Sequence, residues 1–148
     1  LRMISYGVYI LTSKMNSEVS AATVTWVSQA SFEPPMLSVC IKRDSGSYKV
    51  VKDRGEFILH MLGKNQKDLA ATFIKPTKVK SGLINGEKYE IKNDLPLIMD
   101  AAAYIYCHVL EILENGDHPL FLAKVKEVTV IEKVAPLKLC QTAWSYGG

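Results

Sequence analysis

Cysteine, long apolar runs and targeting segments are scarce or missing in this sequence. The three cysteines are an odd number without the C-x-x-C spacing of a zinc site, which argues against a disulfide framework and a zinc centre. No run approaches the roughly 18 apolar residues of a membrane span, and the N-terminus lacks the basic, apolar and small-residue succession of a signal peptide. We therefore expect a cytoplasmic protein that makes no membrane contact.

A large excess of one charge is missing as well. Eighteen Lys and Arg residues against fifteen Asp and Glu residues give a formal net charge of +3. This is far below the clustered basic excess that binding to a phosphate backbone requires, so nucleic acid is not an expected partner. The length of 148 residues and the hydrophobic share of 48% predict one folded domain over residues 1–148.

What the sequence has in abundance is short runs of β-branched and aromatic residues. These predict strands over residues 6–12, 19–27, 36–42, 56–62, 104–113 and 119–131. Pro34-Pro35 should mark a sheet edge or corner, because proline cannot donate to a ladder. Asn115-Gly116-Asp117 predicts a hairpin turn with positive φ at Asn-Gly. The apolar pattern of the last strand shifts by one residue near Glu127, which predicts a β-bulge there.

Two short helices are expected between these strands. Asp44 or Ser45 should cap a helix over residues 47–53 that Gly55 ends. Asn65 with Asp68 resembles a capping box for a second helix that ends near residue 76, and residues 75–96 suggest a long loop or a flap of poorly paired strand. Antiparallel strands with two short helices indicate a mainly β protein with a barrel or barrel-like sheet, not a doubly wound α/β fold.

A hydroxyl-bearing strand is the most unusual stretch. Alternation puts Thr23 and Thr25 on one face and Val24 with Trp26 on the other, and the polar run 28–31 follows. Hydroxyl and backbone N–H groups beside apolar side chains could cradle a planar heterocycle and its phosphate. The alternative is that the threonines are ordinary strand formers on a solvated face, and composition alone favours that alternative.

Two further groups could carry chemistry. Arg43, Ser45 and Ser47 surround the start of a predicted helix, where the free N–H groups and the helix dipole attract an anion. Ordinary capping by Asp44 or Ser45 is the favoured alternative unless the threonine strand lies next to this turn in space. His118 follows the predicted hairpin turn at a fixed place on a strand end. His60 and His108 lie within apolar strands and should be packed, and the absence of acids at a suitable spacing argues against a metal site.

The combination of these segments resembles one protein family. The run Trp26-Val27-Ser28-Gln29-Ala30-Ser31-Phe32-Glu33-Pro34-Pro35, the turn Gly116-Asp117-His118 and the terminal Tyr146-Gly147-Gly148 are similar to the flavin reductase-like family of FMN-binding split barrels. The resemblance is strongest to the domains found with flavodiiron proteins and high-molecular-weight rubredoxins. It implies a homodimeric split β-barrel with short helices and Greek-key-like antiparallel strands.

The resemblance also implies roles for individual residues. Flavin, as FMN or alternatively FAD or riboflavin, would lie along Thr23, Val24, Thr25, Trp26, Ser28, Gln29 and Ala30, and its phosphate would meet Arg43, Ser45 and Ser47. His118 would be the catalytic residue on the nicotinamide side, and Tyr146 would cover the ring. The chain departs from the family at Ser20-Ala21, where many members have Asn-Gly, and at Ser45-Gly46-Ser47, where Ser-x-Thr is common.

The implied activity is hydride transfer from NADH or NADPH to flavin, with electrons passed on to a rubredoxin, a flavodiiron protein or a monooxygenase. The alternative is a flavoredoxin-type electron-transfer protein that holds FMN and is reduced by a protein partner. No Rossmann fingerprint distinguishes NADH from NADPH. The segment Lys75 to Lys92 holds five lysines and two glutamates; we expect a solvated surface there, and the alternative is a positive rim that attracts the dinucleotide or an acidic partner.

Overall fold

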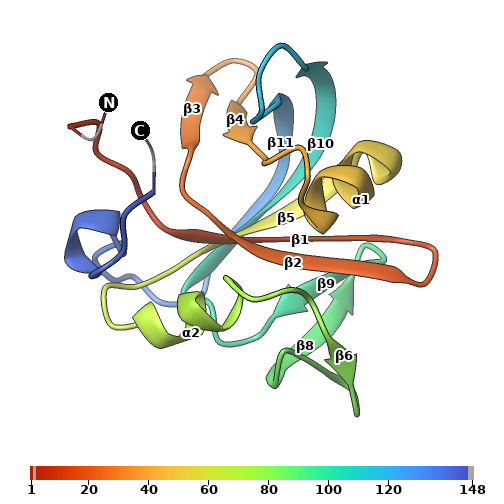
Figure 1. The fold of residues 1–148 in the computed structure, drawn as a ribbon, viewed down its shortest axis with the longest axis vertical. Helices are drawn as coiled ribbons and strands as arrows, with labels where there is room; N and C mark the ends of the chain where they lie inside the picture. The colour runs from red at the N-terminus through yellow and green to blue at the C-terminus, as the bar shows by residue number, and fades with distance from the viewer. Residues whose placement is uncertain (2, 147–148) are drawn as a thin grey trace.

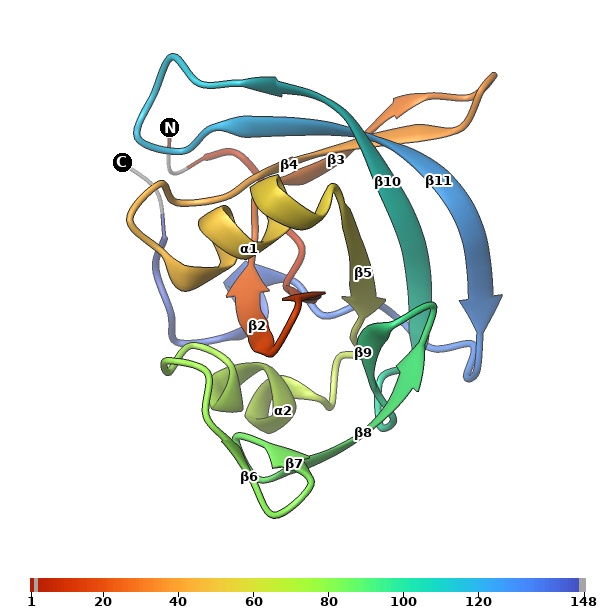
Figure 2. The ribbon, with the colours of Figure 1, turned by 90° about the vertical axis from the view of Figure 1, so that its right-hand side faces the viewer.

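A curled antiparallel sheet of seven strands forms the body of the molecule. The computed structural model describes residues 1 and 3–146, and the sheet order is β2-β1-β5-β10-β11-β4-β3. Its strands are β1 (Tyr9–Met15), β2 (Glu18–Val24), β3 (Val27–Ser31), β4 (Met36–Cys40), β5 (Glu56–Met61), β10 (Ala103–Leu113) and β11 (Leu120–Val130). Figures 1 and 2 show the sheet bending around itself so that β1 and β2 cross beneath β3 and β4. The expected mainly β, antiparallel fold is confirmed.

Both faces of the central strands are buried, and this gives the molecule two apolar clusters. On β1 the neighbours Ile10 and Leu11 are fully buried on opposite faces, as strand alternation requires. Leu11 packs inside the curled sheet with Phe121 and with Val51 of helix α1 (Gly46–Arg54), whereas Ile10 packs against Phe73 on the other side. Helix α1 therefore fills the interior of the curled sheet (Figure 2), where it contacts β1 and β2.

The expected caps are confirmed for α1 only. Ser45 is its N-cap, with a side chain that accepts from the Tyr48 N–H at 3.2 Å, and Gly55 ends it with φ of 73°. The capping box at Asn65 is wrong, because α2 (Lys67–Thr72) is preceded by Gln66, whose side chain makes no cap. Its Oε1 instead accepts from the Gly63 N–H at 2.8 Å, which turns the preceding chain.

The lysine-rich segment is more regular than the sequence predicts. It forms a four-stranded sheet of β6 (Val79–Lys80), β7 (Leu83–Ile84), β8 (Glu87–Lys92) and β9 (Leu95–Ile98). Strand β9 is wholly buried and packs on the main sheet, where the Thr12 hydroxyl donates to the Pro96 carbonyl at 2.5 Å. Of the two alternatives for residues 75–96, the long loop is wrong, and the flap of strand is confirmed by the short strands β6 and β7. The buried β9 was not expected, because it is the surface beneath it that buries the apolar side chains around Pro96.

Histidines 60 and 108 have opposite surroundings. His60 is fully buried, with Nδ1 3.0 Å from the Ile10 carbonyl and Nε2 accepting from the Ile98 N–H at 2.9 Å. Burial lowers its pKa to about 4. The packed state predicted for His60 is confirmed. That predicted for His108 is wrong, because its side chain points outward beside the inward-facing Cys107 and is 54% exposed.

The hairpin of β10 and β11 agrees with the sequence except at its turn. Between Val125 and Glu127 the strand carries one extra residue, so the predicted bulge is confirmed. The connection over residues 114–119 is a wider bend, and Gly116 does not have positive φ, so the predicted Asn-Gly turn is wrong. Pro34-Pro35 lies in the turn that joins β4 to β3, the edge strand of the sheet, as expected.

Candidate functional site

A cavity of about 1000 Å³ opens between β2, the N-terminus of α1 and the last described segment of the chain. Its lining comes from residues 18–26, 40–42, 44–47, 50, 73–77, 118, 139 and 144–146. Strand β2 supplies one wall, and the turn before α1 supplies another. The fold thus brings together segments that are more than a hundred residues apart in the sequence.

Most of the residues singled out from the sequence meet at this cavity. Those that line it are Thr23, Val24, Thr25, Trp26, Ser45, Ser47, His118 and Tyr146. Ser28, Gln29 and Ala30 are exposed on β3 and lie outside the lining, as does Arg43. Arg43 instead turns its guanidinium to the carbonyls of Glu114 and Gly116. A binding role for each of these residues stays a prediction.

An aromatic cluster closes one end of the cavity. The rings of Trp26 and His118 have centroids 4.5 Å apart, and the Tyr146 ring lies 5.6 Å from Trp26. His118 Nε2 is 2.5 Å from the Tyr146 hydroxyl, and Nδ1 is 3.0 Å from a carboxylate oxygen of Asp117. The His118 side chain is only 12% exposed, so both ring nitrogens are held in place.

Charge around the cluster is set by the same contacts. The hydrogen bond and the charge of His118 lower the pKa of Asp117, which keeps its carboxylate ionised beside the imidazole. Burial raises the pKa of the Tyr146 phenol, so this hydroxyl stays protonated near neutral pH. When the His118 ring carries its proton on Nδ1, this N–H donates to the Asp117 carboxylate, and Nε2 accepts from the Tyr146 hydroxyl.

Three polar atoms in the wall of the cavity are buried without a partner. Among the described residues they are Ser20 Oγ, Thr25 Oγ1 and Trp26 Nε1. Thr23 differs, because its hydroxyl donates to the Ala70 carbonyl at 2.6 Å and ties β2 to α2. Leaving a buried polar group unpaired costs about 1–3 kcal/mol. Three such groups on one wall indicate that a polar ligand completes this site.

The N-terminus of α1 also lines this cavity. The first N–H groups of a helix have no partners within it and carry partial positive charge. Gly46 leaves open space where a side chain would begin, with no atom within 4 Å. Lys42 lies beside it, and its hydrogen bond to Asp44 raises its pKa, so it stays charged. This end is suited to an anion such as a phosphate.

Other kinds of site find no support in the part of the chain that the structure describes. No group of three or more His, Cys, Asp or Glu side chains there could hold a metal ion. None of the helices over residues 3–146 is long and apolar enough to cross a membrane.

Comparison with known proteins identifies the family. The model of the flavin reductase like domain matches residues 1–145. The chain belongs to this family. A putative diflavin flavoprotein A 6 of Nostoc sp. is 31% identical over 126 residues, which are 84% of this chain and 22% of that protein. The reductase component of a 4-nitrophenol monooxygenase from Rhodococcus opacus is 31% identical over 121 residues, 82% of this chain and 64% of that protein.

Solved structures agree with the assignment. The flavin reductase of the styrene monooxygenase from Pseudomonas putida S12 superimposes with a TM-score of 0.79 at 25% identity, over 93% of this chain and 87% of that one. The flavin reductase PheA2 gives a TM-score of 0.77 at 25% identity, over 91% and 85%. The flavin reductase-like domain described here thus has the split-barrel architecture of these proteins.

The cavity of this flavin reductase-like domain fits a flavin nucleotide. The unpartnered hydroxyl and indole groups of β2 lie along one wall, where ring oxygens and nitrogens can pair with them. Apolar side chains such as Val24 and Phe73 cover the same space, and the anion-binding helix end is where a phosphate could lie. A planar ring with a phosphate tail would pair with the polar atoms of the wall and with the helix N-terminus at the same time. Neither feature alone would call for both parts of such a ligand.

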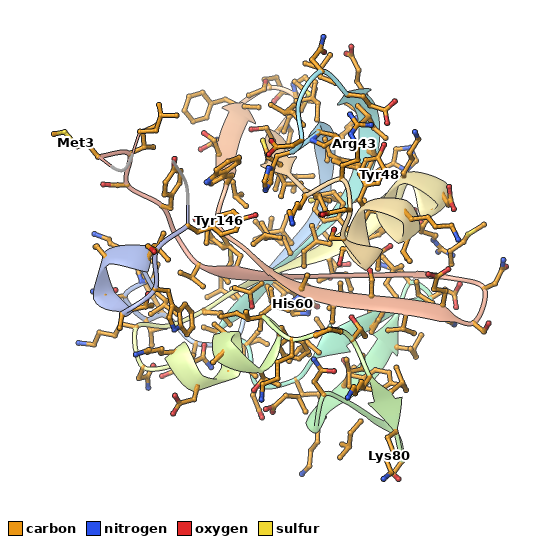
Figure 3. The ribbon with its side chains drawn as sticks, viewed as in Figure 1. Met3, Arg43, Tyr48, His60, Lys80 and Tyr146 are labelled. Atoms are coloured by element: carbon orange, nitrogen blue, oxygen red, sulfur yellow. The ribbon has the colours of Figure 1, made fainter. Side chains whose placement is uncertain are left out.

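Sequence reasoning missed several residues that line the cavity. Ser20 and Lys42 both line the cavity, although the sequence marks Ser20 only as a departure from the family and indicates Arg43, not Lys42, for the anion. The Thr77 hydroxyl accepts from the Ala21 N–H at 3.0 Å and donates to the Ala21 carbonyl at 3.1 Å, so it caps the edge of β2. Trp144 could have been found, because it lies two residues before Tyr146. Of the lysine-rich segment only residues 75–77 line the cavity, and Lys80 lies far from Tyr146 in Figure 3.

Proposed function

We propose that this domain is an NAD(P)H-dependent flavin reductase that binds FMN in the cavity and passes the electrons on to an acceptor. The observation that carries the proposal is the set of unpartnered polar atoms on β2 and on the two residues that follow it, which share one cavity with the N-terminus of α1 and with His118. Family membership and the relatives named as reductase components support the reaction class.

Each end of the cavity has its own task in this proposal. Ser20, Thr25 and Trp26 hold the heterocycle by hydrogen bonds that they lack in the free protein. Lys42 and the first N–H groups of α1 hold the phosphate. The flavin, when bound, supplies the ring that accepts the hydride. The protein needs no obligatory base, so its residues bind, orient and exclude water.

His118 and Tyr146 orient the second substrate. Their rings lie nearly perpendicular to each other, with centroids 5.7 Å apart, where the aromatic cluster borders the cavity. Asp117 fixes the orientation of the imidazole, and Tyr146 is 45% exposed, so this pair presents a partly accessible polar and aromatic surface. We assign to it the contact with the nicotinamide. In this proposal both substrates bind in the same cavity.

The assembly and the acceptor of the domain are part of the proposal. We propose a homodimer, because the apolar residues Leu110 of β10 and Val128 and Val130 of β11 are each more than half exposed. We propose that the protein acts in the cytoplasm and that its electron acceptor is a monooxygenase, a flavodiiron protein or a rubredoxin. A relative named as the reductase component of a monooxygenase supports the monooxygenase as acceptor.

Visible absorption spectroscopy tests the proposed function. FMN is added to the purified protein, unbound flavin is removed, and NADH and then NADPH are added without oxygen. We expect retained yellow colour that a nicotinamide bleaches. A protein that stays colourless contradicts flavin binding. Retained flavin that neither nicotinamide reduces contradicts the reductase and favours the flavoredoxin-type electron carrier.

A further inference from the structure

Arg43 makes three hydrogen bonds to the short loop that carries His118. Its backbone N–H donates to the Asp117 carbonyl at 2.9 Å, and its guanidinium Nη2 donates to the carbonyls of Glu114 and, at 3.1 Å, Gly116. On the other side of His118, the Ile41 N–H donates to the Pro119 carbonyl at 3.1 Å. The end of β4 and the residues after it therefore hold the loop on both sides of the histidine.

The loop needs such outside support. Residues 114–117 are exposed, and Gly116 does not adopt the left-handed backbone that would make a tight hairpin turn. A wide, exposed bend without a turn of defined type has few bonds of its own to fix its conformation. The position of the His118 ring against Trp26 thus depends on the contacts that the loop makes with Arg43.

Arg43 is itself anchored on helix α1. Its guanidinium lies 5.8 Å from the centre of the Tyr48 ring and 4.0 Å from the Glu114 carboxylate. Tyr48 donates its hydroxyl to the same carboxylate, and Lys52 Nζ approaches it at 2.8 Å. Glu114 thus ties the loop to α1 by its side chain while its carbonyl is held by Arg43.

The direction of the guanidinium excludes it from the cavity. Lys42 and Asp44 line the cavity on either side of Arg43 in the chain, but Arg43 does not. We propose that Arg43 is a positioning residue, which holds His118 in place for contact with the nicotinamide, and is not a ligand of the flavin phosphate. The proposal rests on the proposed function for the role of His118, but the placement of the ring can be measured without flavin.

Nuclear magnetic resonance of the flavin-free protein tests the placement directly. The His118 ring protons lie against Trp26, so their resonances should be displaced by its ring current. We expect Arg43→Met to remove most of this displacement. Arg54→Met is the matched control, because the Arg54 guanidinium bonds Glu56, Asp94 and Asn93 and, among the described residues, none of the His118 loop. It should leave the displacement unchanged, and unchanged resonances in Arg43→Met would overturn the proposal.

Binding and kinetics separate positioning from phosphate binding. Arg43→Met should keep the Kd for FMN within about twofold and slow reduction of bound flavin by nicotinamide about tenfold, with little further effect in the His118→Ala background. Arg43→Lys should not restore the rate, because an ammonium cannot bridge two carbonyls as the guanidinium fork does. An Arg43→Met protein that loses affinity for FMN but not for riboflavin, and that Arg43→Lys rescues, would show a phosphate ligand and contradict the proposal. If the wild-type protein is not reduced by nicotinamide, the proposed function fails while the resonance experiment still decides the placement.

Discussion

The hydroxyl of Tyr146 lies 2.5 Å from Nε2 of His118 and joins the last described residue of the chain to the β10–β11 connection. Because the His118 ring also packs on Trp26 at the end of β2, three distant segments meet at one end of the cavity. The aromatic cluster is therefore a tertiary feature that closes the site where a second substrate would enter.

Replacing His118 should separate flavin binding from flavin reduction. We expect His118→Ala to slow reduction of bound flavin by nicotinamide about tenfold, because the fixed imidazole at the cavity edge is lost. The Kd for FMN should change little, since the unpartnered polar groups of β2 and the α1 N-terminus stay intact. Rapid-mixing kinetics and flavin titration measure the two effects, and a wild-type rate of reduction in the variant would refute this role.

The Tyr146 hydroxyl can be removed with a matched control. Tyr146→Phe keeps the ring beside Trp26 but deletes the bond to His118, so we expect a reduction rate lower by about threefold. Tyr6→Phe is the control, because Tyr6 also lies near Trp26, at 6.3 Å, and does not contact His118 in the described contacts. Equal rates for both variants and the wild type would show that the hydroxyl does not contribute.

Removing the unpartnered hydroxyl of Thr25 should not destabilise the flavin-free protein, unlike most substitutions of buried residues. Thr25→Val should leave the free energy of unfolding of the flavin-free protein unchanged or raise it by about 1 kcal/mol, because an unpaired buried hydroxyl is removed. The same change should weaken FMN binding about fivefold or more. Thr23→Val should lower the stability of the flavin-free protein by about 1 kcal/mol, because its bond to Ala70 is lost. Urea unfolding and FMN titration of both variants test the pair, and a destabilised Thr25→Val protein would argue against an empty ligand position.

The buried His60 should make stability depend on pH. Its folded pKa is about 4 and its unfolded value about 6.5, so the unfolded chain binds the proton more readily and stability falls as pH decreases through this window. Between about pH 7 and about pH 5 we expect a loss of about 2 kcal/mol. Urea unfolding at both values measures it. His108→Gln, at an exposed position, should keep this loss, whereas His60→Gln should reduce it.

Much of the fold follows from local patterns along the chain. The β-branched runs predicted the long strands, and Ser45 and Gly55 marked the ends of α1 because caps depend on neighbouring residues only. The shift in apolar phase near Glu127 revealed the bulge for the same reason. Strand β9 was missed because its four residues are buried by tertiary packing, with no alternation to read. His108 was misjudged because its outward orientation is decided by which face of the strand meets the core.

The site was less accessible to sequence reasoning. Thr25 and Trp26 could be singled out as residues, but that their polar atoms lack partners is a property of the folded wall. Arg43 was assigned to an anion from its place before a helix, and only the structure shows its guanidinium bonded to loop carbonyls 71 and 73 residues away. The spacing of residues along one sequence cannot predict hydrogen bonds between residues so far apart.

Anaerobic rapid mixing of the FMN-loaded protein with NADH and with NADPH, followed by the visible absorption of the flavin, tests the proposed reaction most directly. We predict that the absorption disappears in a single phase whose rate saturates with one of the two nicotinamides, and that deuterium at the transferred position slows it. Bound flavin that stays oxidised with both nicotinamides would contradict the proposal that this cavity brings nicotinamide and flavin together.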